Sequence, residues 1–142
     1  MATKFTGGCL CGAVRYECSA EPVVSGFCHC RDCQRETGSA FGSTLFVPRN
    51  AVTIRGDVRY YETTGDSGNV VSRGFCPTCG ARLFGKPALL PEVTAIRAGS
   101  LDDPSWFRPE RHIFVSSAQP WDFINPELPR FAKMPPITSY KR

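Results

Sequence analysis

The sequence contains no long hydrophobic run. Its N-terminus reads MATKFTGGCLCG, which has no apolar stretch of signal-peptide length. No other segment approaches the length of a membrane span. We therefore expect a cytoplasmic protein that is not embedded in a membrane. Disulfides are rare in the reducing cytosol, so we expect the thiols of the eight cysteines to be free for metal binding.

Blocks of basic residues, internal repeats and low-complexity tracts are also absent from the sequence. The formal net charge of +4 treats every cysteine as neutral. One zinc ion bound by four thiolates and a second bound by three would bring this charge to about +1, because metal-bound thiols are deprotonated. The sequence therefore does not predict nucleic-acid binding.

Long helices are not expected, because 13 Gly and 12 Pro favour short strands and turns. A chain of 142 residues is long enough for one domain with a sizeable core. We expect a single domain over residues 1–142 with a proline-rich C-terminal tail from about residue 120. The aromatic residues of this tail, Trp121, Phe123 and Phe131, are expected to pack on the sheet.

Short β-rich runs bounded by turn residues predict a mainly β fold. In residues 13–18, Val14, Tyr16 and Cys18 alternate with charged residues, so they should share one face. The runs on either side of Gly56-Asp57 predict a β-hairpin. A short helical turn is predicted over 31–37, followed by a glycine that can end it. The predicted strands cover residues 13–18, 40–47, 52–55, 58–62, 70–75, 81–84, 93–98 and 112–116.

Two of the cysteine motifs together offer four thiolates. In an extended segment, side chains two residues apart point to the same side. Cys9 and Cys11 can therefore present both sulfurs to one ion. The sequence FCPTCG, which contains Cys76 and Cys79, suits a turn that brings two sulfurs together. These four cysteines form a complete tetrahedral set, which we assign to a structural zinc ion.

The middle motif, C-x-C-x-x-C, offers only three thiolates, those of Cys28, Cys30 and Cys33. His29 lies between the first two and should point away from them, and His112 is distant in the sequence. Three protein ligands with an exchangeable fourth position are typical of a catalytic zinc ion. A thiol substrate would suit this sulfur-rich shell.

The spacing of the motifs leaves the grouping of the cysteines open, because Cys30 and Cys33 could in principle join Cys9 and Cys11. The isolated Cys18 lies on the apolar face of a predicted strand. We interpret it as a small buried hydrophobic residue.

The motifs GGCLCGAVRYEC, CHCRDCQRETGSAF and FCPTCGARLF, in this order, resemble the glutathione-dependent formaldehyde-activating enzyme (GFA) family, which also includes centromere protein V. The similarity continues weakly through HIFVSSAQPW and LPRFAKMPP, so it covers nearly the whole chain. It implies a mainly β, zinc-stabilised β-tent fold with two zinc ions. The structural site would be formed by Cys9, Cys11, Cys76 and Cys79, and the catalytic site by Cys28, Cys30 and Cys33.

The resemblance also implies a reaction, the addition of glutathione to formaldehyde to give S-(hydroxymethyl)glutathione. This is formally a carbon–sulfur lyase reaction. The expected partners are therefore a small-molecule thiol such as glutathione and a small aldehyde. Because glutathione carries two carboxylates, cationic groups should line its site. Arg31, Arg35 and Arg73 lie near cysteine motifs and are candidates, although each could equally be a solvated surface residue.

Two other interpretations stay open from the sequence. The protein could be an enzyme that acts on a different thiol. It could also be a non-catalytic zinc-binding interaction module or thiol carrier of the same fold. Thiol specificity separates the first alternative from the glutathione enzyme, and a labile second zinc ion that accepts added thiol would argue against an inert module.

Overall fold

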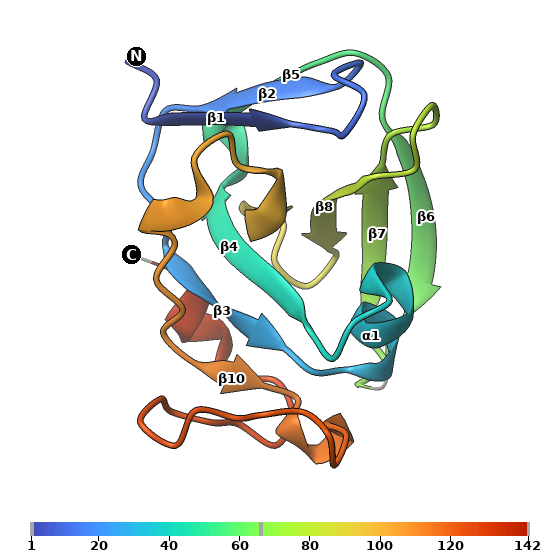
Figure 1. The fold of residues 1–142 in the computed structure, drawn as a ribbon. Helices are drawn as coiled ribbons and strands as arrows, with labels where there is room; N and C mark the ends of the chain where they lie inside the picture. Colours follow the sequence, from blue (N-terminus) through green and yellow to red (C-terminus); the bar gives the residue numbers. More distant parts are fainter. Residues whose placement is uncertain (1, 66, 142) are drawn as a thin grey trace.

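A computed structural model describes residues 2–65 and 67–141. The chain forms two β-sheets (Figure 1). The smaller sheet has the strand order β1-β2-β5, and the larger has the order β10-β3-β4-β9-β8-β7-β6. Neighbouring strands are antiparallel except β10 and β3, which are parallel. The strands are β1 (Phe5–Gly8), β2 (Arg15–Cys18), β3 (Val24–Cys28), β4 (Gly42–Pro48), β5 (Val52–Arg55), β6 (Arg59–Thr64), β7 (Val70–Phe75), β8 (Arg82–Pro87), β9 (Val93–Arg97) and β10 (His112–Ile113). The predicted mainly β class is confirmed.

Helical structure within the described residues is limited to one α-helix and short 3-10 turns. The predicted turn over 31–37 is α1 (Arg31–Thr37), and Gly38 ends it with a φ of 70° and a bond from its N–H to the carbonyl of Gln34. The 3-10 turns are η1 (Arg49–Ala51), η2 (Ala98–Ser100), η3 (Pro104–Trp106), η4 (Val115–Ser117) and η5 (Ile137–Tyr140). None of these helices, within the parts of the chain that the structure describes, is long and apolar enough to cross a bilayer.

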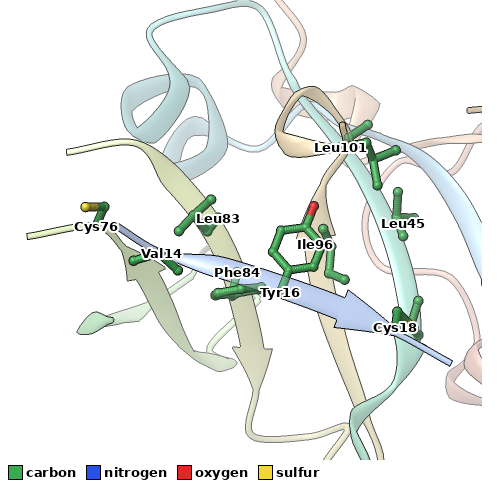
Figure 2. Packing of buried hydrophobic residues seen from close by; sticks show 11 residues of the cluster. Val14, Tyr16, Cys18, Leu45, Cys76, Leu83, Phe84, Ile96 and Leu101 are labelled. Carbon is green, nitrogen blue, oxygen red and sulfur yellow. The ribbon is translucent and has the colours of Figure 1, made fainter. Parts of the chain in front are cut away.

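The main hydrophobic core lies between the two sheets (Figure 2). The predicted alternation is confirmed, because Val14, directly before β2, and Tyr16 and Cys18 within it are all at most 3% exposed. Their partners come from central strands of the larger sheet: Leu45 of β4, Leu83 and Phe84 of β8, and Ile96 of β9. The smaller sheet therefore covers one face of the larger sheet with a continuous apolar layer.

The hairpin predicted around Gly56-Asp57 is wrong. β5 pairs with β2, whereas β6 pairs with β7, so the chain passes here from one sheet to the other. Gly56 has a φ of 93°, and a Cβ atom at this position would lie 2.1 Å from the carbonyl oxygen of Ala13. The glycine is thus required by a close backbone approach next to the smaller sheet and not by a two-residue hairpin turn.

The structure has two strands that the sequence did not predict, and it shortens a third that the sequence did predict. β1 and β3 were not predicted, because the sequences FTGG and VSGFC contain glycines that weaken the strand pattern. The strand predicted over 112–116 is limited to β10, because Phe114 adopts a φ of 58° and the chain then enters η4.

The C-terminal segment packs differently from the prediction. Trp121 and Phe123 are 71% and 77% exposed, so the expectation that they cover the sheet is wrong. Between them, the carboxylate of Asp122 takes the inward position and is only 2% exposed. Tyr140, at the end of η5, instead provides the buried ring, which lies 4.9 Å from the ring of Phe46 in β4.

We predict that Leu45→Ala lowers the free energy of unfolding by about 2–5 kcal/mol, because it removes a fully buried side chain between the two sheets. Urea denaturation measures this loss. Ile54→Ala is the matched control, since Ile54 of β5 is 36% exposed and should lose much less. Equal losses in the two variants would contradict the position of the core.

Candidate metal centre

The first cysteine cluster joins the two sheets. The sulfurs of Cys9, Cys11, Cys76 and Cys79 all lie within 4.8 Å of one another. Cys9 and Cys11 follow β1, whereas Cys76 and Cys79 lie in the turn between β7 and β8. The Sγ atoms of Cys9 and Cys11 are 3.7 Å apart, and those of Cys11 and Cys76 are 3.9 Å apart. A tetrahedral zinc ion with Zn–S bonds of 2.3 Å needs sulfurs about 3.8 Å apart, so the donor set fits this ion.

Backbone N–H groups also point at the sulfurs of this cluster. The N–H of Val14 donates to Cys9 Sγ over 3.2 Å, and the N–H of Thr78 donates to Cys76 Sγ over 3.4 Å. Hydrogen bonds from the backbone of Ala81 and Cys11 lower the pKa of Cys79 to about 6. Such donors stabilise thiolates, which are the form of cysteine that binds metal.

The second cluster lies at the junction of β3 and α1. The sulfurs of Cys28, Cys30 and Cys33 lie within 4.8 Å of one another. Cys28 ends β3, Cys30 caps α1, and Cys33 is in the first turn of the helix, where its N–H donates to Cys30 Sγ over 3.3 Å. The structure thus brings together the three residues of the middle motif and keeps them apart from the first cluster. The alternative pairing of Cys30 and Cys33 with Cys9 and Cys11 is wrong for this structure.

Two arginines lie beside the sulfur of Cys33. Nη1 of Arg73 and Nη2 of Arg97 are each 3.7 Å from Cys33 Sγ. Both guanidinium groups also bind Oε2 of Glu36, and the distance from Arg97 is 2.5 Å. The pKa of Cys33 lies well below its usual range because of hydrogen bonds from Cys28 and Cys30 and because of the positive charges of Arg97 and Arg73.

The sequence indicated one of these two arginines. Arg73 lies close to the FCPTCG motif and was a candidate. Arg97 was missed, since it lies far from every cysteine motif and reaches the site only through the pairing of Thr44 with Arg97 between β4 and β9. Of the other candidates, Arg31 binds the side chain of Gln34, and Arg35 is exposed on α1.

The second cluster forms part of the wall of a cavity of about 130 Å³. The rest of the wall is largely apolar, with a few polar residues such as Asn69 and three arginines, Arg73, Arg97 and Arg111. Among the residues that the structure describes, no further Cys, His, Asp or Glu joins the three cysteines of this cluster. The cluster can therefore hold a metal ion and still leave one side open to a small molecule.

The two histidines belong to a buried hydrogen-bond chain. Nδ1 of His29 lies 2.6 Å from the carboxylate of Asp122, and Nε2 of His29 lies 2.8 Å from Nδ1 of His112. The N–H of Asn125 donates to Nε2 of His112 over 3.2 Å. With His112 thus protonated at Nδ1 and His29 protonated at Nδ1, every ring nitrogen has a partner. The expectation that His29 points away from the neighbouring cysteines is confirmed.

Cys18 takes part in neither cluster. It is 1% exposed in the main core, and burial raises the pKa of its thiol. The interpretation of Cys18 as a small buried hydrophobic residue is confirmed.

Comparison with known proteins identifies the family of this chain. The family model of the glutathione-dependent formaldehyde-activating enzyme matches residues 4–117, which include all seven clustered cysteines. The chain belongs to this family.

Two individual proteins are also similar. A Penicillium rubens protein named "Putative glutathione-dependent formaldehyde-activating enzyme" is 29% identical over 122 residues, which cover 80% of this chain. The aligned part spans 63% of the length of that relative. A crystal structure of a Rhodobacter sphaeroides protein has a TM-score of 0.54 and 22% identity, and it covers 88% of this chain and 98% of its own. The structural likeness supports the fold.

We predict different roles for the two cysteine clusters. Cys79→Ser should prevent stable folding, because it removes one of the four cysteines that could hold a zinc ion between the two sheets. Cys33→Ser should give a folded protein with less zinc at one site. Zinc content by mass spectrometry and folding by circular dichroism measure both effects. Equal loss of fold in the two variants would contradict this division of roles.

We further predict that Asp122→Ala lowers the free energy of unfolding by about 1–3 kcal/mol, because Nδ1–H of the fully buried His29 loses its acceptor. Denaturation with urea measures the change. Asp57→Ala, at an exposed position, is the matched control and should have little effect. A loss at Asp122 no larger than at Asp57 would show that the histidine chain does not hold the C-terminal segment.

Proposed function

We propose that this protein is a zinc-dependent enzyme that forms and breaks the carbon–sulfur bond between a thiol and a small aldehyde. The observation that carries the proposal is the cluster of Cys28, Cys30 and Cys33 in the wall of a cavity, with no fourth side-chain ligand among the described residues. Membership of the family and the name of the Penicillium rubens relative support glutathione and formaldehyde as the substrates.

The three cysteines would hold the zinc ion and leave room for the sulfur of the substrate on the cavity side. A free thiol has a pKa of about 8.5, so only a few per cent of it is thiolate at neutral pH. When bound there, zinc would supply the positive charge that keeps such a thiol deprotonated. The largely apolar wall lowers the local dielectric around the sulfur, and this would strengthen electrostatic interactions in the cavity.

Arg73 and Arg97 have two roles in this proposal. Their positive charges offset the negative charge that three thiolates concentrate at Cys33. Their N–H groups can also donate to an aldehyde oxygen as it gains negative charge. Glu36 binds both guanidinium groups and so holds them beside the sulfur.

The addition conserves oxidation state. The thiol loses its S–H proton to solvent, and its sulfur forms a bond to the aldehyde carbon. The C=O π bond breaks, and the oxygen takes up a proton from solvent. With glutathione and formaldehyde the product is S-(hydroxymethyl)glutathione, and the reverse reaction is the lyase direction.

We predict that the zinc-loaded protein accelerates the exchange between free formaldehyde and S-(hydroxymethyl)glutathione. Exchange NMR on formaldehyde plus glutathione measures the rate. Because the addition also occurs spontaneously, the observable is the increase in rate over a sample without protein. Cys33→Ser should abolish the increase, since it removes a ligand of the second cluster.

Cys18→Ala is the matched control, because Cys18 lies outside both clusters. It should keep the acceleration. A protein with two bound zinc ions that gives no acceleration with glutathione and formaldehyde would contradict the proposed reaction. Such a result would favour a thiol carrier or an enzyme for a different thiol.

A further inference from the structure

Arg111 lies on the same face of the sheet as the second cysteine cluster. In the parallel pairing of β10 with β3, Ile113 is opposite Cys28. The N–H of Phe27 donates to the carbonyl of Arg111 over 3.0 Å, so the pairing continues to this residue. Arg111 lies two positions before Ile113, about 7 Å away along an extended backbone, so the two side chains point to the same face. Arg111, Ile113 and Cys28 all line the cavity.

The guanidinium group of Arg111 is buried without an ionic partner. The residue is only 8% exposed, and Nη2 has no hydrogen-bond partner among the described residues. None of the carboxylates in the described part of the chain forms an ion pair with it. Its flat faces contact aromatic rings, with the Tyr140 centroid at 4.8 Å and the Phe131 centroid at 5.8 Å. These contacts orient the group, and the Tyr140 side chain also hydrogen-bonds with it, but Nη2 is left without a partner.

The other two arginines of the cavity differ from Arg111 in this respect. Arg97 binds Glu36 and donates from Nη1 to the hydroxyl of Thr44 over 2.6 Å. Arg73 binds Glu36 and donates from Nε to the hydroxyl of Thr63 over 3.1 Å. Their charges are therefore partly neutralised within the protein. Among the described arginines of the cavity wall, Arg111 differs in having no carboxylate partner and a buried N–H group, Nη2, without an acceptor.

We propose that Arg111 binds a carboxylate of the substrate, so that the enzyme selects thiols that carry a carboxylate a few bonds from the sulfur. This inference rests on the proposed function, because it assumes that the substrate sulfur lies at Cys28, Cys30 and Cys33. A carboxylate is the anion that matches the planar donors of a guanidinium group. Arg111 and the three cysteines line the same cavity, so one small molecule that carries both a thiol and a carboxylate can contact both.

The test compares glutathione with glutathione dimethyl ester, in which both carboxylates are neutral. Isothermal titration calorimetry on the zinc-loaded protein measures the affinity of each thiol for wild type, Arg111→Gln and Arg55→Gln. Arg55 is the control because it is an exposed arginine of the smaller sheet. The readout is the affinity for glutathione divided by the affinity for the dimethyl ester, measured for each protein. Comparing this ratio between wild type and variants removes any intrinsic difference between the two thiols.

We expect the preference for the acid over the ester to fall by about 10- to 100-fold in Arg111→Gln and to stay at the wild-type value in Arg55→Gln. If Arg111→Gln does not fold, Arg111→Lys takes its place and should give an intermediate ratio, since lysine keeps the charge without the planar pair of donors.

Three outcomes would overturn the inference, and they can be told apart. If the wild-type protein binds both thiols equally, or if the ratio does not change at Arg111, the carboxylate does not contact this residue, and the proposed thiol site stands. If the wild-type protein binds neither thiol, the proposed function fails as well.

Discussion

The electrostatic repulsion between thiolates is the constraint on which the rest of the structure depends. Seven cysteine sulfurs are gathered in two clusters, each with its sulfurs within 4.8 Å of one another. Deprotonated thiols at this separation repel strongly unless a cation lies among them. In the first cluster, the sulfur spacing fits one zinc ion with four ligands. A zinc ion at this position would hold the turn between β7 and β8 to the segment after β1.

The second cluster meets the same constraint with fewer ligands and additional protein charges. Cys33 has two arginines beside it, and Glu36 pairs with both of them. With a zinc ion bound, the charges of this group would balance, because three thiolates and Glu36 carry four negative charges and the zinc ion and the two arginines carry four positive charges. Arg111 adds a further cation at the cavity wall. Such a site suits an incoming anion better than a zinc ion with four thiolates would, because the latter has a net charge of −2.

Features that depend on residues close together in the sequence could be predicted, whereas features that depend on residues far apart in the sequence could not. The cysteine motifs and the helix ended by Gly38 depend on neighbours within a few residues, so spacing and turn chemistry were enough to find them. Arg97, in contrast, reaches Cys33 only through strand pairing, and no local signal marks that register. The hairpin prediction failed for a related reason, because a glycine needed for a close backbone approach has the same local appearance as a turn glycine. Trp121 and Phe123 were misplaced because the inward position between them is taken by Asp122, whose buried partner is His29.

The central claim is that the sulfur of the substrate completes the second metal site. Cadmium-113 NMR of the cadmium-substituted protein tests it directly, because the chemical shift reports the number of sulfur ligands at each site separately. The account predicts two resonances, one of which stays in place while the other moves downfield when glutathione is added. Two resonances that both remain unchanged at saturating glutathione would contradict it.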